Sequence, residues 1–276
     1  MRRLLNIELY KIYYNKASRN LIVIYFLLLT SVALTSLIKF DIGPIKFDLA
    51  EQGVFDFPHI WHINTFIAAI LKFFLLLVIV SMMSNEYSYK TLKQNLIDGL
   101  SKKEFLLSKL YAVIAIAAAS TIFIFILSLI LGIAYSNNNE IGIIFSDLEY
   151  LVAFFVKLVC YFSFGLFLGI LIKRSAFAIA AFIVWFFIEQ IIFLILLWQH
   201  SSKTIAQEIK NFFPLEAMQV LIIEPTSRLG IVKTVSKQME LDAVNYAVTP
   251  LKLVIVLAWT CIFIYLSYTL LKKRDL

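Results

Sequence analysis

Three charged side chains interrupt long apolar runs, where an ionised group needs a partner or a polar cavity. They are Lys72, Lys157 and Glu189. Each lies seven to nine residues inside its run, or about 10–14 Å from the outer surface at about 1.5 Å per helical residue. Charge at that depth is costly unless it is paired or faces water. We expect Glu189 to neutralise Lys157 or Lys72 beside a pathway. The alternatives are lysines that reach the outer surface, with Glu189 protonated or bonded to a helix, and a direct role in substrate binding.

No other pattern in the chain has the residues of a known catalytic or metal site. The sequence contains no GxxxxGK phosphate-binding loop and no HExxH or GxSxG motif. His59 and His62 are three residues apart, with His200 elsewhere, but no carboxylate or thiol set completes a metal site. We therefore expect no catalytic residue, no metal and no ATPase centre in this chain.

The segment 84–110 has the pattern of a short amphipathic helix, a turn and a second helix. Its apolar residues recur at three-to-four-residue spacing, at Tyr89, Leu92, Leu96 and Leu100. Glu86 and Lys90 are four residues apart and are expected to pair on that helix. Gly99 ends the pattern, and Ser101-Lys102-Lys103-Glu104 matches a capping box that starts the next helix. An exposed helix of this kind either lies on lipid or docks into a groove on a soluble partner.

These segments belong to a chain whose apolar residues are gathered into membrane-length runs. Hydrophobic residues make up 61% of the sequence, whereas soluble proteins are about half apolar. Runs of about 20 apolar residues cross a bilayer as helices. Six such spans are predicted, at 20–37, 63–83, 111–134, 150–172, 176–198 and 251–271. The fold class is therefore an all-α polytopic membrane protein with one transmembrane domain, 1–276.

The net charge of +7 indicates the orientation of these spans rather than nucleic-acid binding, because the basic residues lie between the apolar runs. Five Lys or Arg precede the first span, five follow the second, two follow the fourth and three end the chain. The loops after the first and third spans carry two and none. Short basic loops stay in the cytoplasm. We therefore expect the protein to lie in the cell membrane with both termini in the cytoplasm.

Two segments outside the spans have helical patterns of their own. Residues 1–19 alternate apolar and basic side chains and predict an interfacial helix on the inner leaflet. Residues 199–250 form an extracytoplasmic insert, where Pro214 suits a helix start and 215–223 is too short to span. The alternative for the insert is a small external domain packed on itself. Trp61, Tyr150 and Trp198 near span ends suit the interfacial aromatic belt.

The cytoplasmic segment carries a resemblance to a known family. The residues concerned are Glu86, Tyr89, Thr91-Leu92, Leu96, Leu100-Ser101-Lys102 and Lys109, with Glu8-Leu9-Tyr10-Lys11 and Asn211-Phe212-Phe213-Pro214 elsewhere. Together with the span number and orientation, they resemble the permease subunits of type-2 ABC exporters. The family often has Gly before the Thr, where this chain has Lys90.

The resemblance implies a permease half that pairs with a second half, as a homo- or heterodimer, to form the pathway. It also implies a coupling helix that docks a cytosolic ATP-binding subunit, which would bind ATP and Mg²⁺, and short re-entrant helices in the insert. The implied docking residues are Glu86, Tyr89, Thr91, Leu92, Leu96, Leu100, Ser101 and Lys102. The alternatives are a stand-alone channel or secondary transporter, an intramembrane enzyme and a membrane assembly factor. The aromatic-rich spans favour a hydrophobic or amphiphilic cargo.

Overall fold

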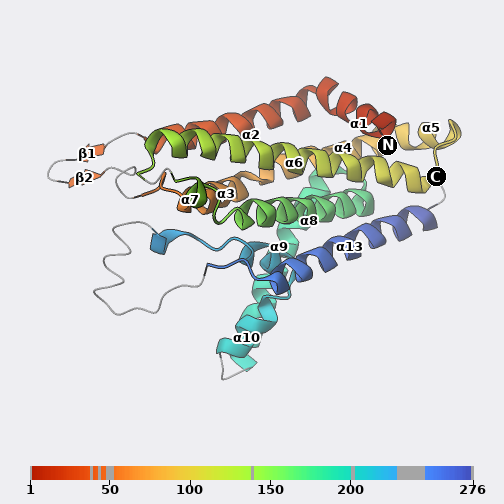
Figure 1. The fold of residues 1–276 in the computed structure, drawn as a ribbon. Coiled ribbons are helices and arrows are strands. Elements are labelled where there is room, and N and C mark those ends of the chain that lie inside the picture. Colours follow the sequence, from red (N-terminus) through yellow and green to blue (C-terminus); the bar gives the residue numbers. More distant parts are fainter. Residues whose placement is uncertain are drawn as a thin grey trace.

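The computed structural model describes residues 2–37, 40–42, 45–47, 53–137, 140–199, 203–228 and 246–274, and most of them are helical. The long helices are α2 (Lys16–Thr35), α4 (Phe73–Ser88), α6 (Lys102–Tyr135), α8 (Glu149–Ile172), α9 (Ser175–Gln199) and α13 (Pro250–Lys273). The shorter helices are α1 (Arg2–Tyr14), α3 (His59–Leu71), α5 (Thr91–Ile97), α7 (Ile141–Ile144), α10 (Lys203–Lys210), α11 (Pro214–Val220) and the 3-10 turn η1 (Thr226–Arg228). Figure 1 shows α2, α6, α8 and α13 lying lengthwise beside one another.

The predicted membrane spans correspond to helices in the structure. Among the described residues, five single helices are long and apolar enough to cross a bilayer, and the bent pair α3 and α4 makes a sixth. Helices suit this setting because every backbone N–H and C=O is satisfied inside the segment. The chain is therefore an all-α polytopic membrane protein, as its apolar runs predict.

The second span is bent by 44° at Lys72, between α3 and α4. The Lys72 ammonium donates a hydrogen bond to the carbonyl oxygen of Ala69 at 2.8 Å. That oxygen belongs to the last turn of α3, where carbonyl groups lose their helical partners. The lysine thus occupies the break that divides this span into two helices.

Helix α8 lies at the centre of the bundle and packs against α4, α6, α9 and α13. In the most apolar 18-residue stretch of α8, 72% of the residues are buried, whereas in that of α9 only 11% are. Gly165 and Gly169 let α4 approach closely: a Cβ on Gly165 would lie 2.3 Å from Leu76 Cδ1, and one on Gly169 would lie 3.1 Å from Met83 Cβ. Two glycines four residues apart are a common way to bring membrane helices together.

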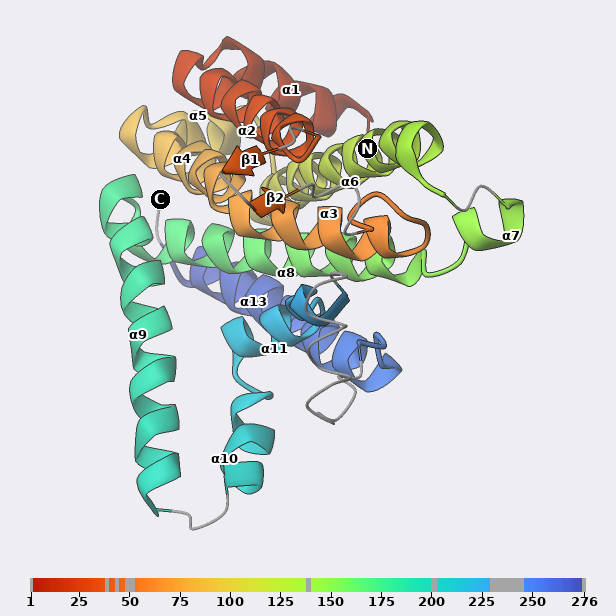
Figure 2. The same ribbon diagram turned by 90° about the vertical axis from the view of Figure 1, so that its left-hand side faces the viewer.

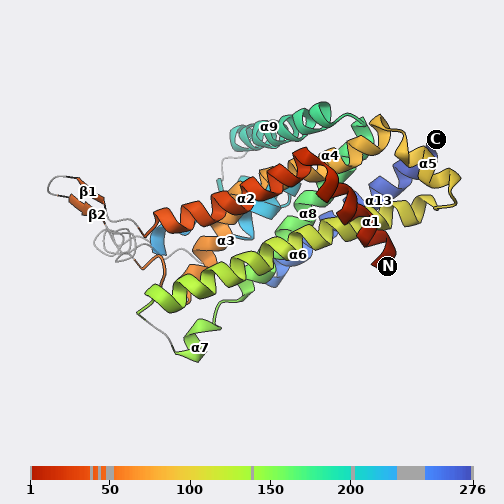
Figure 3. The same cartoon turned by 90° about the horizontal axis from the view of Figure 1, so that it is seen from above.

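The two chain ends lie at one end of the bundle, beside α5, which we call the α5 end (Figures 1 and 3). This agrees with an even number of spans, while the cytoplasmic identity of that end stays a prediction. At the opposite end, β1 (Phe40–Ile42) and β2 (Ile45–Phe47) pair antiparallel, with Phe40 opposite Phe47. Figure 2 shows α9 leaving the bundle at a steep angle and carrying α10 with it.

The end opposite α5 is closed by polar contacts between buried aromatic side chains and the backbone. Trp61 donates from Nε1 to the carbonyl oxygen of Ile144 at 2.8 Å, and the Tyr150 hydroxyl donates to the carbonyl oxygen of Tyr246 at 2.9 Å. Both side chains are buried. Their assignment to an interfacial belt was wrong, because their polar tips find partners inside the protein. Trp198 is exposed, as that assignment requires.

Candidate functional site

The predicted helix, turn and helix at 84–110 is confirmed at the α5 end. Helix α4 ends at Ser88, Lys90 takes a left-handed φ of 57°, and α5 runs from Thr91 to Ile97. Gly99, with a φ of 93°, turns the chain toward α6. The capping box is present: Ser101 Oγ accepts from the Glu104 backbone N–H at 3.1 Å, and Glu104 Oε2 accepts from the Ser101 N–H at 2.9 Å.

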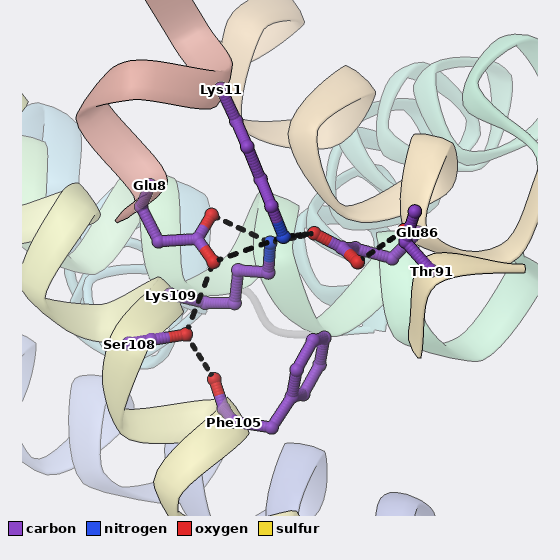
Figure 4. A network of polar contacts seen from close by, with 7 residues as sticks. All are labelled: Glu8, Lys11, Glu86, Thr91, Phe105, Ser108 and Lys109. Carbon is purple, nitrogen blue, oxygen red and sulfur yellow. Dashed lines mark hydrogen bonds and ion pairs between the residues drawn. The ribbon is translucent and has the colours of Figure 1, made fainter. Parts of the chain in front are cut away.

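A group of charged and hydroxyl side chains, most of them buried, lies at the start of α5, and we call it the charge cluster (Figure 4). Its members are Glu8 and Lys11 from α1, Glu86 from α4, Thr91 from α5, and Ser108 and Lys109 from α6. Lys109 Nζ lies 2.7 Å from Glu8 Oε2 and 2.5 Å from Glu86 Oε1. Lys11 Nζ lies 2.7 Å from the same Glu86 oxygen. The carboxylate–ammonium network therefore joins three helices, α1, α4 and α6.

A hydroxyl group lies beside each of the two carboxylates. The Thr91 hydroxyl donates to Glu86 Oε2 at 2.5 Å. The Ser108 hydroxyl lies 3.2 Å from Glu8 Oε1 and 2.7 Å from the Phe105 carbonyl oxygen, which competes for its single proton. Two carboxylates and two ammonium groups balance in charge, and Lys109 is fully buried. Buried charges are tolerated when they are paired with opposite charges, as the charges of this cluster are.

The predicted pairing of Glu86 with Lys90 is wrong. It assumed one continuous helix, but α4 ends before Lys90, whose left-handed backbone reverses the direction of the chain. Lys90 is exposed. Glu86 points inward instead and binds Lys109, Lys11 and Thr91. This difference places Glu86 under α5 rather than on its outer surface.

The apolar stripe of α5 faces the protein itself. Leu92 is buried, and Leu96 and Leu100 pack against the hydrophobic core. The outward side of α5 carries Lys93, Gln94 and Ile97, and Ile97 is exposed to 69%. Tyr89, which caps the end of α4 just before α5, is exposed to 74%. Of the residues predicted to meet a partner, Tyr89 is thus outward, whereas Glu86 and Leu92 are covered by their own chain.

The end of α13 is attached to the same region. Lys102 Nζ donates to the carbonyl oxygen of Arg274 at 2.7 Å and to that of Lys272 at 3.3 Å. Arg274 in turn donates to the Tyr87 hydroxyl and to the carbonyl oxygens of Ile170 and Leu171. A cation at a helix C-terminus satisfies carbonyl groups that have no helical partner. Lys102 therefore joins the start of α6 to the end of α13.

The intramembrane carboxylate, Glu189, does not contact the two intramembrane lysines in the described structure. Glu189 accepts hydrogen bonds from Trp185 Nε1 at 2.7 Å and from the backbone N–H groups of Leu215 and Glu216 at 3.1 and 3.3 Å. It thus sits at the N-terminus of α11, where a carboxylate is favourable. Within the described part of the chain, Glu189 forms no ion pair with Lys72 or Lys157. Glu189 is therefore bonded to a helix, which was the alternative to the expected pair. The predicted pairing of Glu189 with a lysine is wrong.

Sequence reasoning missed the roles of Glu8, Lys11 and Lys109, although all three stand in the segments that carry the family resemblance. Glu8 and Lys11 are three residues apart on α1 and face the same side, which was available as a local signal. Lys109 was counted as a loop charge, because its depth in the fold depends on how α1 and α4 pack over α6. No group of three metal-ligating side chains occurs among the described residues; His200 lies outside them.

Comparison with known proteins agrees with this architecture. The family model described as "ABC-2 family transporter protein" matches residues 7–276. None of the curated proteins compared matches the chain. The matched range includes the charge cluster, α5, the bent span and the segment before α13. Because the match covers almost the whole length, the chain belongs to the ABC-2 family of transporter proteins.

Proposed function

We propose that this chain is the permease subunit of an ATP-driven ABC exporter. Two six-helix halves would form the pathway in the cell membrane, with both termini in the cytoplasm, and a separate subunit would bind ATP and Mg²⁺. The observation that carries the proposal is the charge cluster, which joins α1, α4 and α6 and holds the start of α5 through the hydrogen bond from Thr91 to Glu86. Helices that are joined through one buried network move as one body, and α5 is bonded to that network. Force applied to α5 is therefore passed to two membrane spans.

The contact surface for the ATP-binding subunit is the outward side of α5 together with the adjacent Tyr89. It consists of Tyr89, Lys93, Gln94 and Ile97. A short exposed helix with an aliphatic residue, preceded by an exposed aromatic residue, suits a groove on a partner. The other residues first expected to dock then position this face: they are Glu86, Thr91, Leu92, Leu96, Leu100, Ser101 and Lys102.

Affinity recovery of the tagged chain in mild detergent tests this proposal. Wild type is compared with the double variant Tyr89→Asp and Ile97→Asp, which places two charges on the outward side without opening the core. We expect wild type to recover a soluble protein with a GxxxxGK loop, identified by mass spectrometry, and the double variant to lose it. Burying two unpaired carboxylates against a partner is strongly unfavourable.

The matched control is Tyr135→Asp with Ile141→Asp, a tyrosine and an isoleucine that are exposed at the opposite end of the bundle. The control is expected to keep the ATP-binding protein. Retention of that protein by the Tyr89 and Ile97 variant would disprove the docking surface. If correctly inserted wild type recovers no ATP-binding protein, the exporter assignment itself is wrong, and the chain is to be tested alone as a channel or carrier.

A further inference from the structure

An open cavity of about 460 Å³, lined by both polar and apolar side chains, lies far from the charge cluster. Its walls come from α3, from Lys72 at the bend, from Lys157 on α8 and from the segment 216–224. Lys72 precedes Glu86 by 14 helical positions, or about 21 Å at about 1.5 Å per residue. The cavity is therefore separate from the proposed docking surface.

Two lysines share this cavity, and neither is neutralised by a described carboxylate. Lys72 donates to the Ala69 carbonyl oxygen, and its ammonium lies 4.6 Å from the centre of the Tyr161 ring. Lys157 is exposed to only 3% and makes no hydrogen bond or ion pair within the described residues. Its amino group is thus a buried hydrogen-bond donor whose open side is the cavity.

Two carboxylates also line the cavity, and they do not supply the missing anion. Glu216 Oε2 lies 3.1 Å from Lys210 Nζ and is already paired. Glu224 is exposed and forms no ion pair with either lysine in the described part of the chain. A buried lysine carries its charge most easily when an anion lies beside it. A bound anion would therefore complete the polar contacts of Lys72 and Lys157 in this cavity.

A second cavity, of about 240 Å³, adjoins the first and has a different character. Lys72 and Gln219 line both. The remaining lining of the second cavity is largely aromatic and includes Tyr161, Phe182 and Phe186. The cavity with two lysines, beside the largely aromatic cavity, suits a molecule with an anionic head and an apolar tail.

We propose that Lys72 and Lys157 bind the phosphate or carboxylate head of an anionic amphiphile, while its tail lies along the largely aromatic cavity toward α9. This inference rests on the proposed function in one respect: the amphiphile would be the class of cargo that the permease moves. Charge-assisted hydrogen bonds to the two ammonium groups supply affinity for the head. The tail is accommodated without further polar partners.

Binding is tested on the purified chain in a neutral detergent, without any ATP-binding subunit. The probe is dodecyl phosphate, and its binding is followed by the shift in thermal unfolding temperature. Dodecylphosphocholine and inorganic phosphate serve as the zwitterionic and head-only probes. We expect dodecyl phosphate alone to stabilise wild type, and Lys157→Met to weaken its binding about tenfold, the effect of losing one charge-assisted hydrogen bond.

A second variant, Lys72→Met, removes the hydrogen bond to Ala69 and so also affects the bend. Lys157→Met breaks no described hydrogen bond and therefore tests the head site alone. The matched control is Lys252→Met, a half-buried lysine that lines a different cavity. Equal binding by wild type and Lys157→Met, or equal loss in Lys252→Met, would overturn the site. If dodecyl phosphate binds but the affinity recovery yields no ATP-binding protein, the anion site is supported and the proposed exporter function is wrong. In the assembled complex, stimulation of ATP hydrolysis by dodecyl phosphate supports the cargo class, and binding without stimulation rejects it.

Discussion

Lys109 is the side chain on which the charge cluster depends most. Its ammonium contacts both buried carboxylates, Glu8 and Glu86, whereas Lys11 is partly exposed. Replacement by Met keeps the length of the side chain and leaves two carboxylates with too little positive charge. We expect Lys109→Met to lower the free energy of unfolding by about 3–5 kcal/mol, the cost of breaking a buried ion pair from one side. Thermal or chemical unfolding in detergent measures this loss.

The matched control for that variant is Lys103→Met, the same substitution on the same helix at an exposed position. It is expected to change the free energy of unfolding by less than about 0.5 kcal/mol, as is usual for surface substitutions. Similar stability of the Lys109 and Lys103 variants would show that the network adds nothing beyond general helix packing. The idea of α5 as a rigidly held helix would then lose its basis.

At the level of the element, the end of α5 followed from local chemistry, whereas its start after Lys90 and its facing did not. Gly99 and the Ser101 capping box act within a few residues, so they are visible in the sequence. An apolar stripe shows that a helix has a buried side but not what buries it. Leu92 is covered by its own chain rather than by a partner. The contact of Lys109 with Glu8 joins residues 101 positions apart, and no local pattern contains that information.

The packing of α4 on α8 gives a prediction about a pair of elements. A side chain at Gly165 would have its Cβ 2.3 Å from Leu76 Cδ1 and 3.4 Å from Val80 Cγ2. The two γ-methyl groups of valine have to enter the same space. We expect Gly165→Val to push the helices apart and to lower the free energy of unfolding by about 1–3 kcal/mol, the usual cost of overpacking.

The comparison for Gly165→Val is Gly142→Val, because a Cβ at Gly142 meets nothing within 4 Å. Both variants are followed by thermal unfolding in the same detergent. The close-packing argument requires a lower unfolding temperature for the Gly165 variant alone. A decrease of the same size in both variants would attribute the effect to valine in a helix rather than to contact with α4.

For the whole molecule, the sequence predicted the number of spans and the common side of the two termini. It did so because hydrophobic length and charge placement are properties of composition along the chain. The bend at Lys72 and the departure of α9 from the bundle depend on contacts between distant segments. The same holds for Glu189, whose partners Leu215 and Glu216 lie in another helix. An intramembrane charge indicates that a partner is needed, while the fold decides which one.

The surface of α9 bears directly on assembly. Only 11% of the residues in the most apolar 18-residue stretch of α9 are buried, and exposed large side chains cover more than one face of the helix. A helix turned away from its own bundle leaves apolar surface for lipid or a second half. Under the proposed function, we expect a second permease half to pack on α9. This predicts that a photoreactive group on α9 reaches another protein chain in native membranes.

The variant for this measurement is Phe187→Cys in a Cys261→Ser background, because Phe187 and Cys261 are exposed while Cys160 is buried. Labelling with benzophenone maleimide and illumination should yield a protein adduct larger than the 31.8 kDa chain. An adduct of twice that mass, made of this sequence alone, indicates a homodimer; a second sequence in the adduct indicates a heterodimer. Val152→Cys on α8 is the control, since Val152 and Phe187 are each exposed to 57%. If both positions give the same adducts, or neither gives a protein adduct, α9 faces lipid and the second half packs elsewhere.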